Sequence, residues 1–259
     1  MKILGLGILL LAVSLFVVRT AGADAMVTLS ADPTVDTTVS EMENSQMGMG
    51  GETAHTKDPF RGFNKAMFVF NDKAYRYFFK PIHTGYSSIV PPKARGAVKD
   101  AYINIKMPIR FFNCLFQGKF KGAGKELARF VVNSTVGVGG FWDPATKLFH
   151  IKKEDRDFGQ TLGKCKLNPG PYLVLPFVGP TNTRDMFGDL IDTGLNPVSW
   201  VSFFFLTPVE AAGNFTYEGV NNLSTGKGKT YEDITKPALD PYIALQDAYM
   251  KYREKKVKE

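Results

Sequence analysis

The stretch PPKARGAVKDAYINIKMPIRFF, residues 91–112, decides the fold class because its apolar side chains recur at helical spacing. Pro91 and Pro92 end one element and start another, since proline is well tolerated in the first turn of a helix. Pro108 cannot donate a backbone hydrogen bond, so we expect the helix to kink or split there. The residues that share the helical phase are Ala94, Val98, Ala101, Ile105, Ile109 and Phe112.

An aromatic-rich helix is expected upstream of this stretch. Asp58 followed by Pro59 is typical of a helix start, with Asp as the cap and Pro in the first helical position. One helical stripe holds Phe63, Met67, Phe70, Ala74 and Tyr77, and it is widened by Phe68, Tyr75, Phe78 and Phe79. A stripe this wide predicts a helix that is buried or faces lipid.

The rest of the chain also favours helices joined by loops rich in Pro and Gly. Residues 118–124 are expected to form a loop or cap, and the following helix should end at the flexible bend formed by Gly137, Val138, Gly139 and Gly140. Residues 141–180 are irregular, with one short strand at 172–177. Further helices are expected at 183–194, after Pro208 and after Pro241, with a fraying charged tail. The predicted fold is all-α, a ring-like bundle of amphipathic helices.

Four segments are predicted along the chain. Residues 1–23 are typical of a secretory signal peptide, with Lys2 before an apolar run and small residues at Ala21 and Ala23 for cleavage. Residues 24–56 carry six acidic residues and no Lys or Arg, and we expect a disordered acidic linker. Residues 57–252 form the helical domain, and 253–259 form the charged tail.

Composition points to an anionic partner. The net charge is +7, and the acidic linker makes the body more basic than the whole. Nucleic acid and anionic lipid both fit this charge, and the export signal favours lipid and argues against nucleic acid. Phe is abundant, 21 residues against 2 Trp, as expected for core or lipid contact. The two cysteines, Cys114 and Cys165, permit either one disulfide or two free thiols.

Signatures of catalysis are absent from the sequence. No Gly-x-Ser-x-Gly elbow, phosphate-binding loop or metal-ligand spacing of His and Cys occurs. Asp185, Asp189 and Asp192 share one helical face, which could hold a hard cation or act as paired catalytic acids. Such a face is more often solvated or lines a polar cavity. We therefore expect no enzymatic activity, no metal and no cofactor.

Residues 198–206 are the most apolar stretch after the signal peptide. At nine residues the stretch is too short to span a bilayer as a helix, so it suits a core segment or one lying shallowly in the membrane. We expect it to contact the bilayer. The side chains expected to make this contact are Trp200, Phe203, Phe204, Phe205 and Leu206.

A series of ordered motifs between residues 58 and 252 resembles the MlaA/VacJ family. They are DPFRGFNK at 58–65, FN at 70–71, VPPKAR at 90–95, FQG at 116–118, RFVVNST at 129–135, GVGGFWD at 137–143, DFGQTLG at 157–163, GPYLVLP at 170–176, RD at 184–185 and DPY at 240–242. The resemblance implies an all-helical ring on the periplasmic side of the outer membrane. It also implies a lipid path or hinge, for which the candidate residues are Gly137, Gly139, Gly140, Phe141, Arg184 and Asp185.

The resemblance also implies a function without covalent chemistry. Members of the family remove phospholipid that has strayed into the outer leaflet of the outer membrane. The lipid passes through an amphipathic channel to a periplasmic lipid-carrier protein, and trimeric porins are membrane partners. The alternatives are a structural envelope protein that binds porins or lipid, and an envelope hydrolase that uses the Asp185 cluster.

One departure from the family pattern concerns the N-terminus. Typical members are lipoproteins with a Cys at the signal cleavage site, whereas residues 18–23, VRTAGA, contain none. We therefore expect export without N-terminal lipidation. Attachment to the membrane would then depend on apolar surface, on partners or on an uncleaved N-terminal segment.

Overall fold

The computed structural model describes residues 58–259, apart from the side chains of Phe215 and residues 226–230. The expected signal peptide and acidic linker lie outside these residues. The helices are α4 (Arg61–Ala74), α5 (Lys80–Ile89), α6 (Pro92–Ile105), α7 (Met107–Phe116), α8 (Phe120–Thr135), α9 (Pro144–Lys147), α10 (Phe158–Lys164), α11 (Thr183–Leu195), α12 (Pro197–Phe205), α13 (Pro208–Asn222), α14 (Gly228–Thr235) and α15 (Pro241–Lys258). Two π-helical turns, η2 (Tyr75–Phe79) and η3 (Leu223–Lys227), continue α4 and α13. The nearly all-helical fold confirms the predicted class.

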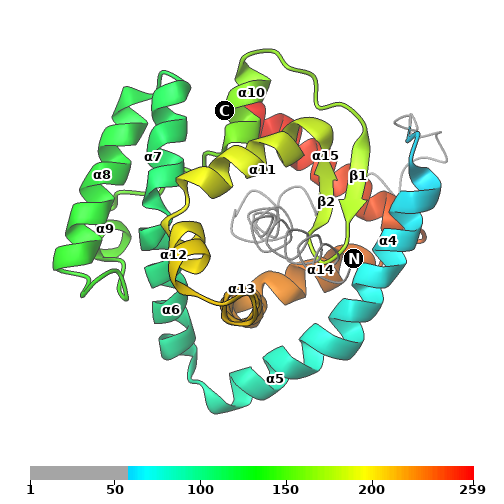
Figure 1. The fold of residues 1–259 in the computed structure, drawn as a ribbon, viewed down its shortest axis with the longest axis horizontal. Helices are drawn as coiled ribbons and strands as arrows, with labels where there is room; N and C mark the ends of the chain where they lie inside the picture. The colour runs from blue at the N-terminus through cyan, green and yellow to red at the C-terminus, as the bar shows by residue number, and fades with distance from the viewer. Residues whose placement is uncertain (1–57) are drawn as a thin grey trace, which may run out of the picture.

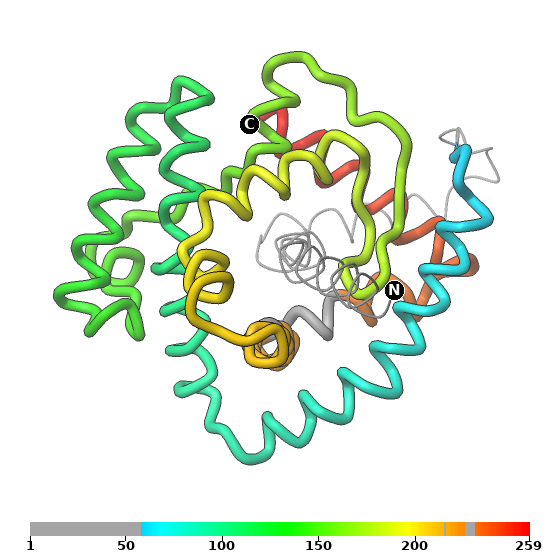
Figure 2. Tube along the Cα trace, viewed as in Figure 1, coloured from blue at the N-terminus to red at the C-terminus, as the bar shows by residue number. Residues whose placement is uncertain are grey.

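The long helices follow one another around a ring. Figure 1 shows α4, α5, α6 and α7 along the outside, with α11, α12 and α13 on the inner side of that arc, and α8 and α9 on one outer flank. The trace in Figure 2 shows α15 starting near the first turn of α4 and running to the C-terminus beside α10. The Tyr242 hydroxyl at the start of α15 donates to the Asp58 carboxylate, which closes the ring.

A two-stranded antiparallel hairpin interrupts the helices. Strand β1 (Tyr172–Leu175) pairs with β2 (Gly179–Asn182), with Tyr172 opposite Asn182. The sequence predicted one strand at 172–177 and missed its partner. Positive φ angles at Phe177 (61°) and Gly179 (95°) reverse the chain within a few residues, and Pro180 in β2 carries no strand signal.

Most helix boundaries marked by proline are confirmed. Helices α6, α12, α13 and α15 each begin at a proline, and the predicted break near Pro108 separates α6 from α7 at Lys106. Helix α4 begins two residues later than expected, at Arg61. There the Asp58 carboxylate accepts from the Phe60 amide (3.1 Å) rather than capping a helix that starts at Pro59.

The expected loop at 118–124 is wrong in its second half. Helix α8 begins at Phe120 and includes Gly122 and Gly124. A Cβ on Gly122 would lie 3.1 Å from the Cys114 sulfur, so glycine permits α8 to approach α7 closely. Cys114 is buried and Cys165 is exposed, and both are free thiols, so no disulfide forms between them.

The buried face of α4 differs from the predicted stripe. Phe63, Phe70 and Tyr77 are 50%, 40% and 79% exposed, whereas Asn64 and Tyr75 are buried. One side of the apolar stripe therefore faces outward, whereas Met67, Phe68, Tyr75 and Phe79 pack against the core beside the polar anchor Asn64. The two apolar clusters of the core instead gather around Tyr231 and Leu245, and around Tyr172 and Tyr249.

The C-terminal residues do not fray. Helix α15 continues to Lys258, and both Arg253 and Lys256 are buried. The charges of Arg253 are compensated by carboxylates of α10 and α11, which the sequence did not predict. No helix in the described part of the chain is long and apolar enough to cross a membrane.

Candidate functional site

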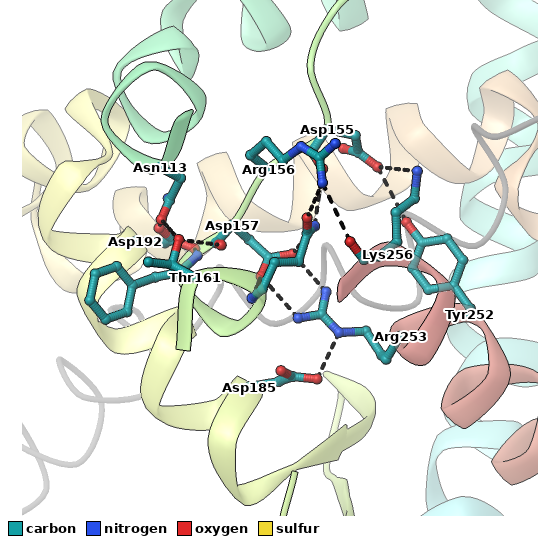
Figure 3. Close-up of polar contacts among 12 residues, drawn as sticks. Asn113, Asp155, Arg156, Asp157, Thr161, Asp185, Asp192, Tyr252, Arg253 and Lys256 are labelled. Carbon is teal, nitrogen blue, oxygen red and sulfur yellow. Dashed lines mark hydrogen bonds and ion pairs between the residues drawn. The ribbon is translucent and has the colours of Figure 1, made fainter. Parts of the chain in front are cut away.

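A buried charge network joins three helices that are distant in the sequence. Arg253 of α15 donates to both oxygens of Asp157, at 2.6 and 2.9 Å, and its Nε donates to Asp185 of α11 at 2.7 Å (Figure 3). Asp157 is the N-cap of α10, and its carboxylate also accepts from the Gln160 amide at 2.7 Å. One guanidinium therefore fixes α10 and α11 against α15.

Asp185 is the most heavily hydrogen-bonded carboxylate of the network. It accepts from the Tyr249 hydroxyl (2.8 Å), from the Asn182 side-chain amide (2.6 Å) and from Arg184 Nε (3.0 Å), besides Arg253. A buried carboxylate needs such partners because its desolvation is costly. Asp185 is thus held for structural reasons and offers no vacant position for a cation.

The electrostatics separate the acids of the network into two kinds. Burial would raise the pKa of Asp157, but Arg253 and the bonds from Gln160 outweigh it and hold the pKa at about 2. Burial and the nearby Asp157 charge raise the pKa of Asp192 to about 8, and they raise the pKa of Asp189 well above its usual range. Asp157 is therefore ionised at neutral pH, whereas Asp189 favours the protonated form.

Close packing of α10 and α11 makes this arrangement possible. A Cβ on Gly188 of α11 would lie 2.3 Å from the backbone nitrogen of Gly159 in α10. Any side chain at position 188 would therefore force the two helices apart. The Asp192 carboxylate accepts from the Phe158 amide (2.8 Å) and from the Asn113 side chain (2.7 Å), which adds α7 to the network.

Two of the three acids on the predicted face, Asp185 and Asp192, are therefore directed into the protein, whereas Asp189 is half-buried. Asp185 and Asp192 are buried and point to donors on α7, α10 and α15. Among residues 58–259 no group of three or more His, Cys, Asp or Glu residues could hold a metal ion. The arrangement braces helices and presents no nucleophile paired with a base.

The glycine bend after α8 is a tight, hydrogen-bonded turn. Val138, Gly139 and Gly140 all have positive φ, at 53°, 71° and 96°. The Gly140 amide donates to the Asn133 carbonyl at 2.8 Å, and the Trp142 amide donates to the Gly137 carbonyl at 3.1 Å. Phe141 lies at the exposed end of the turn and is 55% exposed. The bend therefore presents an apolar side chain from a constrained backbone.

The three glycines of this turn differ in the space around them. A Cβ on Gly140 would lie 2.6 Å from the Asn104 Cβ of α6, and one on Gly137 would lie 2.3 Å from the Trp142 carbonyl oxygen. A Cβ on Gly139 would meet nothing within 4 Å. Gly137 and Gly140 are thus packed positions, and Gly139 is open.

A second buried arginine holds the segment that follows the turn. Arg129 of α8 pairs with Asp143 at 2.9 Å and donates to the Ile151 carbonyl. Asn133 of the same helix donates to Asp143 at 3.0 Å. Since Arg129 is buried, this bracket fixes α9 and the chain up to Ile151 against α8.

Helix α12 presents its aromatic side chains outward. Phe204 and Phe205 are 63% and 81% exposed, Trp200 and Phe203 are also exposed, and Leu206 is half-buried. The Trp200 and Phe204 rings stack with centroids 5.7 Å apart, and Trp200 Nε1 donates to the Gly194 carbonyl at 2.8 Å. Of the two sequence hypotheses for this stretch, a packed core segment is excluded by this exposure.

The residues proposed from sequence thus fall in three places. Arg184 and Asp185 belong to the charge network, the glycines and Phe141 form the turn against α6, and the aromatic residues lie on α12. Sequence reasoning missed Arg253, which was assigned to the tail. Arg253 lies four residues after Tyr249, so the two share the buried face of α15. This helical spacing could have indicated that Arg253 is buried.

Comparison with known proteins supports the motif resemblance. Residues 56–256 match the family described as MlaA lipoprotein. The chain is 32% identical to the intermembrane phospholipid transport system lipoprotein MlaA of Escherichia coli, over 77% of this chain and 78% of that protein. The protein of the same name from Haemophilus influenzae is 27% identical, over 80% of this chain and 82% of the relative.

A solved structure agrees with the fold. A chain reported under "Structural basis for maintenance of bacterial outer membrane lipid asymmetry" is similar with a TM-score of 0.66 and 28% identity, covering 78% of this chain and 99% of that one. Together with the braced helical ring, this similarity defines the class as that of ring-shaped helical proteins of the bacterial envelope. The chain belongs to the MlaA family.

Proposed function

We propose that this protein transports phospholipid between the membranes of the bacterial envelope without enzymatic chemistry. The observation that carries the proposal is the match of residues 56–256 to the MlaA family, whose relatives are named for intermembrane phospholipid transport. In this proposal the ring lies on the periplasmic side of the outer membrane. It removes phospholipid from the outer leaflet through an amphipathic channel and passes it to a periplasmic carrier.

The surface of the ring supports a position in lipid. Large apolar side chains are exposed on α4, η2, α5 and α12, among them Phe63, Tyr77, Ile89 and Phe205. Exposed apolar patches of this kind mark membrane or protein contacts in most proteins. We propose that α12 lies shallowly in the bilayer, and that part of the remaining apolar surface meets a trimeric porin.

The turn at residues 137–141 is the proposed lipid path or hinge. It combines open space at Gly139 with an exposed Phe141 that directly follows three residues of positive φ, a conformation that L side chains rarely adopt. Asp185 supports this path indirectly, since its ion pair with Arg253 braces α11 against α15, and Arg184 pairs with Asp185 within α11. A polar brace behind an apolar surface suits a molecule with a charged head and apolar tails.

The decisive experiment measures lipid asymmetry in cells and bound lipid in the purified protein. Deletion of the chain should expose phospholipid headgroups to a membrane-impermeant amine reagent, and the wild-type gene should restore protection. Mass spectrometry of protein purified in mild detergent should detect intact phospholipid. Unchanged asymmetry after deletion would instead favour a structural protein that binds porins. Conversion of added phospholipid to lysophospholipid or fatty acid by the purified protein would favour a hydrolase.

A further inference from the structure

A basic groove lies on the outer flank of the ring, away from the charge network and the glycine turn. It has a volume of about 530 Å³ and runs between α8 and the segment at 150–152. Its lining residues are Gly124, Lys125, Ala128, His150, Ile151 and Lys152. We call it the α8 groove. Figure 1 shows α8 and α9 on the outside of the ring.

The charge around the α8 groove is positive. Residues 119–155 contain seven Lys and Arg residues and four acids, and one of these acids, Asp155, lies 3.6 Å from Lys153. Glu126 and Asp143 are already paired inside the protein, Glu126 with Arg110 at 2.7 Å and Asp143 with Arg129 at 2.9 Å. Glu154 lies beside the groove and pairs with Lys125 at 3.1 Å. The remaining charge complements an anion.

The wall of the α8 groove is held from within. Buried Arg129 donates to the Ile151 carbonyl, and the Ile151 amide donates to the Ala145 carbonyl at 2.9 Å. Buried Glu126 accepts from the Glu154 amide at 2.7 Å. Two internal charges of α8 therefore fix both ends of the 151–154 segment, so the groove is preformed and a ligand need not order it.

Apolar side chains project next to these cations. Leu148 and Phe149 are adjacent in the chain, each 56% exposed, and His150 follows in a left-handed conformation with φ of 55°. Lys147 precedes them, and Lys152 and Lys153 follow. Exposed apolar residues between lysines are typical of surfaces that lie at a membrane interface, where the apolar groups enter lipid and the ammonium groups meet phosphates.

We propose that the α8 groove binds the phosphate of an anionic phospholipid headgroup at the bilayer surface, with Leu148 and Phe149 entering the apolar layer beside it. The inference rests on the proposed membrane role and adds a preference for anionic lipid to it. Lys125 and Lys152 supply the charge, and the small side of α8 at Gly124 and Ala128 leaves room for the headgroup.

The test is vesicle flotation of the full chain with phosphatidylcholine vesicles and with vesicles that also contain phosphatidylglycerol. The apolar surface gives binding to both, and the α8 groove should add binding only to the second. Neutralising two lysines, Lys125→Gln with Lys152→Gln, should weaken the phosphatidylglycerol-dependent part by between about fivefold and roughly 30-fold, since each unpaired lysine near an anionic surface contributes about fivefold and Lys125 also pairs with Glu154. The matched control, Lys251→Gln with Lys255→Gln on α15, removes the same charge and should keep the preference.

A second variant tests the shape of the groove without changing charge. A Cβ on Gly124 meets nothing within 4 Å, so Gly124→Gln should fold and fill the groove, which should reduce the preference for phosphatidylglycerol. Gly213→Gln on α13 is the control, since a Cβ there also meets nothing. Melting temperatures of all variants report folding.

Three outcomes would overturn the proposal. One is equal binding of the wild-type chain to both vesicles, and another is an unchanged preference in the lysine variant. The third is binding of soluble glycerol phosphate that depends on the two lysines while vesicle binding does not, which would assign the groove to a free phosphate ester. Lipid asymmetry in cells is measured separately from vesicle binding. Failure of the α8 groove proposal can therefore be distinguished from failure of the proposed transport function.

Discussion

Arg253 donates two hydrogen bonds to the carboxylate of Asp157, 96 positions earlier in the chain, at 2.6 and 2.9 Å. The pair joins the last helix of the ring to the N-cap of α10, and Arg253 Nε extends the contact to Asp185 of α11. Because Arg253 and Asp185 are buried and Asp157 is half-buried, the energetic consequence lies in what remains if one of them is removed.

Arg253→Gln should strongly destabilise the fold. The substitution leaves two carboxylates, Asp157 and Asp185, without their shared cation in a buried site, and such losses cost about 3–5 kcal/mol. Chemical denaturation monitored by circular dichroism measures the change. Lys255→Gln, on the exposed side of the same helix, should stay within about 0.5 kcal/mol of wild type. Equal stability of the Arg253 and Lys255 variants would show that the network does not brace the ring.

Asp189→Asn should make the protein more stable at alkaline pH and change the dependence of stability on pH. The folded state raises the pKa of Asp189, so folding favours the protonated acid. Below about pH 4, the usual pKa of an aspartate in the unfolded chain, Asp189 is protonated in both states and does not affect the free energy of unfolding. As the pH rises from there toward the folded pKa, the unfolded state can ionise but the folded state cannot, so stability is progressively lost. Asn cannot ionise, so the variant should gain over wild type at pH 8 but not at pH 4.

Thermal melts of wild type and Asp189→Asn across this range provide the measurement. The control is Asp233→Asn, an exposed acid on α14, which should follow wild type at each pH. The same dependence of melting temperature on pH in wild type and in the Asp189 variant would contradict a raised pKa for this carboxyl.

Asn64→Ala should loosen the β-hairpin. The Asn64 side chain donates to the Tyr172 carbonyl and accepts from the Val174 amide, both at 2.9 Å, and it is fully buried. Its loss leaves two buried backbone groups unpaired, at about 1–3 kcal/mol each. Hydrogen exchange at the Val174 amide should accelerate in step with the loss of stability.

Asn71→Ala is the matched comparison for this anchor. Asn71 lies about two helical turns after Asn64 on α4. Its side chain donates to the Leu175 carbonyl (2.8 Å) and accepts from the Phe177 amide (2.7 Å), but it lies nearer the surface. Water can replace these bonds, so the cost should be smaller than at Asn64. A larger effect at Asn71 than at Asn64 would contradict the role given to burial.

The local parts of this fold were predictable from the sequence, because their causes are local. A proline marks the first turn of several helices, as at Pro92, Pro208 and Pro241, although α4 begins two residues after Pro59. The bend after α8 follows from its glycines, and the positive φ at Gly139 and Gly140 is the conformation that glycine permits.

The non-local parts were not predictable from one sequence. Apolarity placed Phe63 and Tyr77 on the stripe of α4, but it cannot say whether a stripe faces the core or the surroundings, and the buried face carries Asn64 instead. The charge of Arg253 suggested a solvated tail because its two carboxylate partners lie on distant elements. Polar residues become core residues only when the fold supplies their partners.

The glycine turn allows a test that separates folding from transport. Gly140→Ala should cost more than about 1 kcal/mol, because its φ is 96° and the new Cβ would lie 2.6 Å from the Asn104 Cβ. Gly139→Ala should cost about 1 kcal/mol from its positive φ alone, since the space around it is open. Replacing Gly139 and Gly140 together would therefore combine a packing defect at Gly140 with any effect on movement of the turn. Gly139→Ala alone tests the movement without the packing defect.

If the turn moves during transport, Gly139→Ala should impair lipid asymmetry in cells while its melting temperature stays close to wild type. Surface labelling of phospholipid headgroups and thermal melting are the two measurements. Wild-type asymmetry in a folded Gly139→Ala protein would remove the hinge hypothesis and leave the turn as a structural element.

The last prediction concerns α12, whose aromatic face we expect to contact the bilayer. Phe204→Ser removes a ring that is 63% exposed, so the main loss within the protein is its stacking on Trp200, worth about 0.5–1.5 kcal/mol. The protein should remain folded but should be retained less strongly by membranes, as fractionation after a carbonate or salt wash would show. Phe68→Ser is the comparison: Phe68 packs against both apolar clusters and meets Tyr242 edge to face at 5.9 Å. Its loss should cost about 3–5 kcal/mol and unfold the chain rather than release it. Unfolding of Phe204→Ser to the same extent, with no folded protein in the soluble fraction, would mean that the ring of Phe204 supports the fold and not the membrane contact.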